Sequence, residues 1–216
     1  VGEAIVHSGK VVKGEIREGN ACASLDAKRR KALARAHTAT HLLQAALRAV
    51  IGNHVMQQGS FVEEDRFRFD FTHFQGLTSQ ELENIQRMVN DFILRADRVE
   101  KRMVNLEEAK KEGALAFFKE KYSSMVRVVS ISDYSKELCG GTHLDSTAQA
   151  GLFVIVSESS IASGVRRIEA VVGKEAYAYF QKSKDELMKV AQLLRSHPFE
   201  IEGAVKRFFG EAKNCL

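Results

Sequence analysis

The chain has 216 residues, of which 44% are hydrophobic and 28% are charged, and its formal net charge is +4. These values are ordinary for a soluble globular protein, and folding at this size buries roughly 70% of the unfolded surface. No apolar run approaches the length of a membrane span, so we expect no membrane partner and a cytoplasmic location. The three scattered cysteines argue against a disulfide framework and for a reducing compartment.

The N-terminal segment, residues 1–24, contains short runs punctuated by glycine, which is typical of a few short strands. It is too small to close a barrel or a sandwich alone, and its first residue is valine rather than methionine, so we expect the remnant of a domain cut upstream. A long helix is predicted next, from about Asp26 to Ile51. Gly52 supplies the residue type that often follows a helix C-terminus.

The first turns of this helix carry a basic cluster, which contains Arg29, Arg30 and Arg35. Clusters of this kind attract polyanions such as nucleic acids, so these arginines are candidate binding residues. A solvated helix start is the alternative explanation, and for charge runs in general it is the better one.

A turn and a strand are predicted after the long helix. The turn is the sequence QQGS, residues 57–60, and residues 61–71 then alternate between apolar and polar side chains. Because this period is two, Phe67, Phe69 and Phe71 are expected on the buried face of one strand.

The next helix is predicted over residues 78–96, where Thr78 and Glu81 have the spacing of a capping box. Beyond it the pattern predicts strands over 98–106 and 125–131, a helix over 107–122, and a hairpin over 151–158 and 164–173.

Two helices are predicted at the C-terminal end, over residues 174–196 and 200–214, with Pro198 between them. Strands and helices mix without strict alternation along the chain. The expected fold class is therefore α+β, with a mixed or antiparallel sheet packed against helices.

Two histidines, His37 and His41, lie four residues apart on the long helix and therefore share one of its faces. A zinc protease motif has the same spacing but places glutamate directly after the first histidine, where this chain has Thr38. If this pair binds a metal, the remaining ligands must come from elsewhere. An ordinary polar pair is the alternative for these two residues taken alone.

A second unusual stretch, LCGGTH, contains Cys139 and His143 on either side of Gly140 and Gly141. The glycines allow the backbone to approach a ligand closely. Imidazole and thiolate are zinc ligands, and zinc usually takes four of them in a tetrahedron. Taken with the helical histidine pair, this stretch predicts a zinc site, although a lone cysteine at such a turn is usually a small buried side chain.

The remaining polar candidates have weaker support. Arg166 and Arg167 are adjacent on a predicted strand and point to opposite faces, so one of them could contact phosphate. An equally good alternative is one surface arginine and one paired with Glu169 or another acid. We interpret the following residues as structural or surface residues: Asp70, His7, His54, His73 and His197.

The stretches HTATHLL, CGGTH and SGVRRIEAVVG together resemble the editing domain of alanyl-tRNA synthetases, and QQGSFVEEDRFRFDFTHF and EEAKKEGALAFFKEKY are similar to that family's linking segments. The resemblance runs from about Leu25 to the C-terminus. Stand-alone editing proteins share the histidine and cysteine motifs, but the helical tail favours the synthetase.

The resemblance implies hydrolysis of tRNA for alanine that carries serine or glycine, at a Zn²⁺ site formed by His37, His41, Cys139 and His143. It places the family's substrate-pocket glutamine on Gln57. The residues that we expect at the reaction centre are therefore Gln57 and, as a ligand, Cys139. Those expected to contact substrate or tRNA are Arg29, Arg30, Arg35, Gly140, Gly141 and Arg167.

The resemblance also implies three parts: residues 1–24 as the end of an upstream β-barrel, 25–173 as the editing domain, and 174–216 as a connection toward a C-terminal oligomerisation region. The aminoacylation domain, with its ATP site, is not in this sequence. No general base is assigned, and four ligands would close a tetrahedron unless one is loose or the coordination expands. Two other functions remain open, namely a non-catalytic zinc module that binds RNA and a zinc hydrolase of a small molecule.

Overall fold

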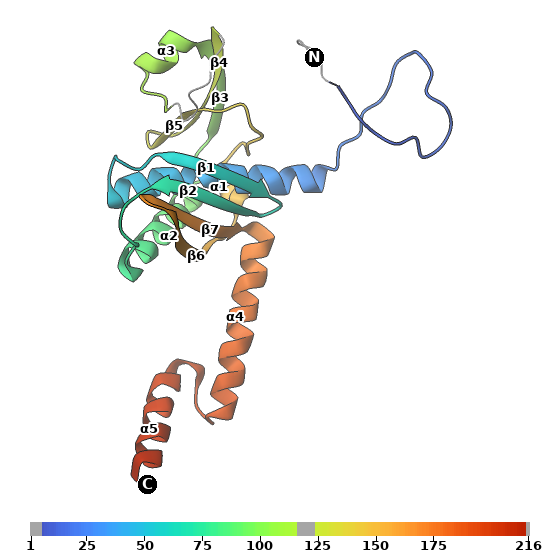
Figure 1. The fold of residues 1–216 in the computed structure, drawn as a ribbon. Helices are drawn as coiled ribbons and strands as arrows, with labels where there is room; N and C mark the ends of the chain where they lie inside the picture. The colour runs from blue at the N-terminus through green and yellow to red at the C-terminus, as the bar shows by residue number, and fades with distance from the viewer. Residues whose placement is uncertain (1–5, 116–123, 215–216) are drawn as a thin grey trace.

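The computed structural model describes residues 6–115 and 124–214. It contains a body of two antiparallel sheets with helices, and a pair of C-terminal helices that extends away from this body (Figure 1). The predicted α+β class with antiparallel sheets is therefore confirmed. Within the described residues, no helix is long and apolar enough to cross a membrane.

The long predicted helix is confirmed as α1, Ala27–Ile51. Asp26 caps its N-terminus by accepting a hydrogen bond from the backbone N–H of Arg29 at 3.0 Å. At its other end the N–H of Gly52 donates to Arg48, and Gly52 has a positive φ of 118°. The helix lies across the body and packs against α2 and the larger sheet (Figure 1), which buries twelve of its side chains.

The larger sheet has the strand order β1-β2-β7-β6, and each neighbouring pair is antiparallel. Its strands are β1 Gln57–Glu63, β2 Arg66–Thr72, β6 Phe153–Ala162 and β7 Val165–Val172. As predicted, Phe67, Phe69 and Phe71 are buried, and they form much of the core beneath α1 and α2, Ser79–Leu94. Thr78 and Glu81 make the predicted capping box.

The turn predicted at residues 57–60 is wrong, because these residues begin β1 and pair with β2. A register shift between Gln57 and Gly59 leaves Gln58 as the extra residue of β1, while Gly59 pairs with Asp70. The true turn of this hairpin lies at Glu64 and Asp65, inside the stretch that was predicted as one continuous strand.

The smaller sheet has the order β3-β4-β5, with β3 Val99–Asn105, β4 Met125–Ile131 and β5 Ser135–Leu138. The sequence did not predict β5, which is only four residues long. The helix predicted over 107–122 is α3, Leu106–Lys111, and it ends there because Gly113 takes a left-handed φ of 74° and Leu115 pairs with β5. Residues 116–122 of that prediction lie outside the described residues.

The two C-terminal helices are confirmed as α4, Gly173–Leu193, and α5, Ile201–Asn214. Pro198 lies between them at the start of a short 3-10 turn, Pro198–Glu200. Only the base of α4 contacts the larger sheet (Figure 1), and its far end contacts the 3-10 turn. Its only buried residues are Ala176, near the base, and Ala191, near the far end.

The strands predicted in the N-terminal segment are not found in its described part, residues 6–24. All of these residues are exposed, including the apolar Val11, Val12 and Ile16. A strand needs a hydrogen-bonded neighbour, and no other described segment pairs with this one.

Candidate metal centre

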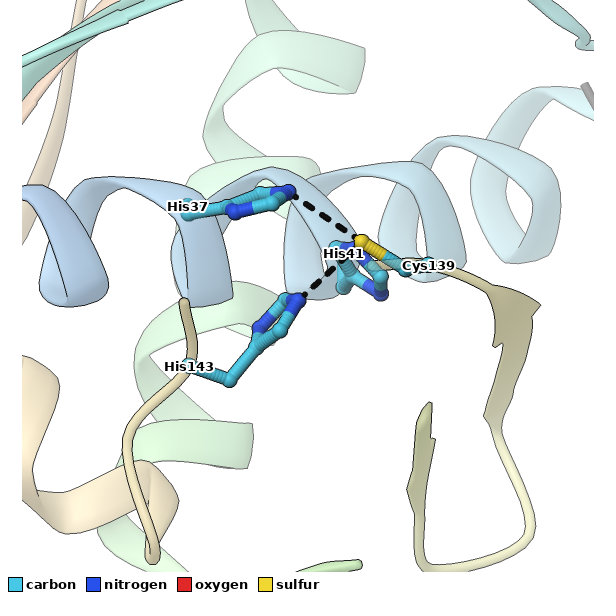
Figure 2. A group of neighbouring side chains, drawn as sticks. All are labelled: His37, His41, Cys139 and His143. Atoms are coloured by element: carbon cyan, nitrogen blue, oxygen red, sulfur yellow. Dashed lines mark hydrogen bonds between the residues drawn. The ribbon is translucent and has the colours of Figure 1, made fainter. Parts of the chain in front are cut away.

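The structure brings together the four residues that the sequence proposed as zinc ligands. His37 and His41 project from one face of α1, and Cys139 and His143 approach them from the loop that follows β5 (Figure 2). One donor atom from each residue lies within 4.8 Å of the other three, and no other such group of three or more is found in residues 6–115 and 124–214. His41 and His143 are buried, at 4% and 7% exposure, and the other two are partly buried.

The distances within this cluster suit a tetrahedral metal. The Sγ of Cys139 lies 3.4 Å from Nε2 of His37 and 3.3 Å from Nε2 of His143 (Figure 2). Zinc bonds of about 2.1–2.3 Å give a tetrahedron with edges of about 3.4–3.8 Å. The two contacts of Cys139 are close to this length. The donor atoms that lie farther apart, by up to 4.8 Å, need to move together only modestly.

Thr38, which stands where a zinc protease has its glutamate, orients His143. Its hydroxyl lies 3.2 Å from Nδ1 of His143 and accepts the backbone N–H of Leu144 at 3.1 Å. If Nδ1–H donates to this hydroxyl, the lone pair of Nε2 is left for the cluster. Thr38 is fully buried, so this contact with His143 is shielded from solvent.

The two glycines of the turn differ in their surroundings. A Cβ placed on Gly141 would lie 1.8 Å from Cε1 of His37, whereas a Cβ on Gly140 would meet nothing within 4 Å. Arg127, on β4, holds the turn by donating to the carbonyl oxygen of Gly141 at 2.6 Å. Gly141 is thus needed for space next to His37, and Gly140 is not.

Burial sets the protonation of the cluster. Desolvation lowers the pKa of His37 and of His143, and it lowers the pKa of His41 to about 3. The three rings are therefore neutral at physiological pH, as metal ligands must be. Burial also raises the pKa of the Cys139 thiol, and a divalent cation in contact with the sulfur would reverse this effect.

One residue of the site was missed by the sequence reasoning. Glu137 is buried beside His41, with its Oε2 3.1 Å from Nδ1 of that ring. Burial raises the pKa of Glu137 to about 8. Strand alternation could have identified Glu137, because it lies two residues before Cys139 and therefore shares its face. Because β5 was not predicted from the sequence, this alternation was not recognised.

Gln57 is placed at the start of β1, where it is partly buried and its side-chain amide donates to Oγ of Ser60 at 2.9 Å. This hydrogen bond does not involve the cluster of histidines and cysteine. Gln57 is thus held by a local contact within β1.

The arginines of the basic cluster have different environments. Arg29 pairs with Glu64 at 2.7 Å in solvent, and Arg35 pairs through two hydrogen bonds of 2.6 and 3.0 Å with the buried Asp65. Arg30 is exposed. Two of the three candidates are thus already paired with carboxylates.

Both arginines of β7 are also paired. Arg166 donates to both carboxylate oxygens of Glu158, at 2.5 and 2.7 Å, and Arg167 donates to both oxygens of Asp70, at 2.7 and 2.8 Å. The ion-pair alternative therefore describes both residues, although neither partner is Glu169. The structural interpretation of Asp70 is consistent with its bidentate pair.

The histidines outside the cluster have local roles. His54 and His73 contact each other through Nε2 and Nδ1 at 2.9 Å, and His197 accepts the N–H of Phe199 at the start of the 3-10 turn. His7 is exposed.

Comparison with known proteins gives two findings. The family described as the threonyl and alanyl tRNA synthetase second additional domain matches residues 126–169, which include Cys139 and His143. The alanine–tRNA ligase of Acetivibrio thermocellus is 49% identical over 209 residues, which are 96% of this chain and 24% of that ligase. Those of Thermotoga maritima and Fervidobacterium nodosum are 49% and 47% identical, over 93% and 97% of this chain and 23% and 24% of the ligases. The chain thus spans about a quarter of the length of the curated relatives it matches, and the predicted resemblance is confirmed.

Proposed function

From its homology, along nearly the whole chain, to one region of the alanine–tRNA ligases, we propose that this protein is an editing deacylase. Its substrate is tRNA for alanine mischarged with serine or glycine, and its cofactor is Zn²⁺. The observation that carries the proposal is the convergence of three imidazoles and one thiol within 4.8 Å. An alanine pocket rejects an added hydroxyl or a lost methyl only about 10- to 200-fold, so a second, hydrolytic site is needed.

The bond to be broken is the ester between the amino acid and the 3′-terminal ribose. Zinc held by His37, His41, Cys139 and His143 would supply a Lewis acid that polarises the carbonyl or activates water. The protein holds these ligands ready through neutral rings and through the hydroxyl of Thr38 on His143.

Two features of the pocket follow from the proposal. Gly141 keeps the turn close to His37, so the substrate approaches a surface formed partly by backbone at Gly140 and Gly141. Gln57 is proposed to hydrogen-bond the aminoacyl group. Its side-chain amide must then release its hydrogen bond to Ser60 and bond to the substrate instead.

The proposed partner is the acceptor end of the tRNA. Arg29, Arg35 and Arg167 already neutralise carboxylates, so their contribution to phosphate binding is smaller than their number suggests. Of these three arginines of α1, Arg30 is the one that is exposed and forms no ion pair within the described residues, so it remains the best candidate. A cytoplasmic location and oligomerisation through a region beyond this sequence are parts of the same proposal.

A second candidate function is a non-catalytic zinc module that binds RNA. It is favoured by the four protein donors, which would fill a tetrahedron and leave no position for water. Hydrolysis separates the two candidates, because both of them bind metal and RNA.

The deciding experiment measures release of serine from serine-charged tRNA for alanine, with and without a chelator. We expect hydrolysis that the chelator abolishes and added zinc restores. Cys139→Ala should lose both zinc and hydrolysis, whereas Cys22→Ala, at an exposed position, should keep both. The same is expected of Cys215→Ala, although Cys215 lies outside the described residues. Stoichiometric zinc without any hydrolysis would favour the RNA-binding module.

A further inference from the structure

The strand β5 and the residue after it direct one carboxylate, Glu137, and one thiol, Cys139, toward the histidines of α1. Side chains alternate along a strand, so Glu137 and Cys139 share a face. The backbone N–H of Cys139 bonds to Arg127 on β4 at 3.0 Å, which extends the strand pairing beyond Leu138 and keeps this alternation. The face that supplies the thiol therefore also supplies a carboxylate.

The geometry points to Glu137 as a positioning residue for the proposed metal centre, which holds the ring of His41 by Nδ1 so that Nε2 faces the other ligands. The atoms Oε2 and Nδ1 are 3.1 Å apart, and the two side chains are only 5% and 4% exposed. The pair is close but is not aligned as a hydrogen bond, so a small rotation of the ring completes the contact. Thr38 already makes the equivalent contact with Nδ1 of His143.

No other described group accounts for the burial of this carboxylate. Its remaining contact is a long one, 3.4 Å from Oγ of Ser135 to Oε1. Arg48 lines the same cavity of about 250 Å³, but its guanidinium donates to the carbonyl oxygens of Asn53 and Val55 and to the side chain of Asn53. A positive charge beside this carboxylate would lower the cost of burying it in its ionised form.

A divalent metal in the cluster would supply that charge. Zn²⁺ with one thiolate leaves one positive charge, and the carboxylate of Glu137 makes the buried assembly neutral. Metal-bound histidines commonly donate their second ring N–H to a carboxylate, which orients the ring and makes it a stronger ligand. This inference rests on the metal binding in the proposed function, but it does not require the hydrolytic step.

The test is the zinc affinity of the 216-residue chain, measured by competition with a chromophoric chelator, together with the visible spectrum of the Co²⁺-loaded protein. We expect Glu137→Leu to weaken zinc binding by about 10- to 100-fold, the range found when such partners are removed. Glu137→Gln keeps the shape and one acceptor oxygen, so it should lose less affinity and shift the cobalt absorption bands.

Glu112→Gln is the matched control, because Glu112 is a carboxylate that pairs with Arg102 and Lys136, and Lys136 lies on the face of β5 opposite to Glu137. It should bind zinc with nearly unchanged affinity. Unchanged affinity and an unchanged cobalt spectrum in Glu137→Gln would overturn the inference, even if Glu137→Leu failed to fold. A wild-type chain that binds zinc but releases no serine would overturn the deacylase proposal alone.

Discussion

The helices α1 and α4 have similar lengths and very different surroundings. Twelve of the 25 residues of α1 are buried, against two of the 21 residues of α4. α1 lies between the larger sheet, α2 and β5, whereas α4 extends from the body with only its base against the sheet (Figure 1). A helical pattern thus predicts where a helix forms, but its neighbours decide what it buries.

This difference explains where the candidate metal centre lies. Two of the proposed ligands, His37 and His41, lie on α1, whose backbone is fixed by core packing on several sides, so their spacing does not depend on a metal. The exposed apolar side chains of α4, among them Phe180 and Leu187, have no such constraint. Substitutions along α1 should therefore change function and stability far more than substitutions along α4.

The largest effect is expected where the turn meets α1. In Gly141→Ala the new methyl group would occupy the position of the His37 ring, so the ring must leave the cluster. We expect a loss of zinc affinity and at least a 100-fold loss of deacylation, as for the removal of a ligand. Gly140→Ala, one residue away and with open space around it, should keep both within about twofold. Equal behaviour of the two variants in chelator competition would contradict this view of the turn.

The cluster could be predicted from sequence because its chemistry is rare and its helical spacing is regular. His37 and His41 follow from the helix period, and Cys139 and His143 from an unusual glycine turn. Glu137 could not be predicted, because a four-residue strand gives too little alternation to recognise. The acidic partners of Arg35, Arg166 and Arg167 could not be predicted either, since each ion pair joins different elements of the fold.

The same reasoning explains the errors in the fold. The stretch QQGS suggested a turn, but it lies in β1, where Gly59 pairs with Asp70 and a register shift takes up Gln58. Residues 6–24 have strand-like composition, yet no described neighbour completes their hydrogen bonds. In the first place strand pairing overrules the local preference, and in the second the local preference has no partner strand; a linear pattern contains neither fact.

Core substitutions give the direct comparison of stability. Phe69→Ala removes a side chain that is 1% exposed from the sheet face under α1, and such a change should lower the free energy of unfolding by about 4 kcal/mol. Phe180→Ala on α4 removes the same side chain from a position that is 54% exposed, and it should change stability by no more than about 0.5 kcal/mol. Urea unfolding of both variants measures the difference. Similar losses would mean that α4 is covered by another surface in solution.

The ion pair between Arg35 and Asp65 is the next test, because it lies on the same helix but outside the metal cluster. Arg35→Gln leaves the carboxylate of Asp65, which is 5% exposed, without its partner. We expect a loss of about 3 kcal/mol in the free energy of unfolding, since an unpaired buried charge is costly. Arg29→Gln breaks an exposed pair and should cost less than about 1 kcal/mol. If Arg35→Gln were as stable as the wild type, its ion pair would not be structural, and a role in binding tRNA would become more plausible.

The smallest expected effect concerns the exposed start of α1. Arg30 and Lys31 are exposed and form no ion pair within the part of the chain that the structure describes, so neutralising them should leave the fold and the metal centre intact. If they contact phosphates, each should contribute about one unit to the slope of log affinity against log salt concentration. Arg30→Gln with Lys31→Gln should then bind charged tRNA more weakly and with a slope lower by about two, while hydrolysis at saturating protein stays the same.

The matched control on α4 is Lys182→Gln with Lys184→Gln, which removes two exposed charges from the other helix. Single-turnover deacylation at two salt concentrations measures both quantities. An equal loss in the two double variants would mean that tRNA senses only the net charge, and an unchanged slope in the first would make the basic cluster a solvated helix start.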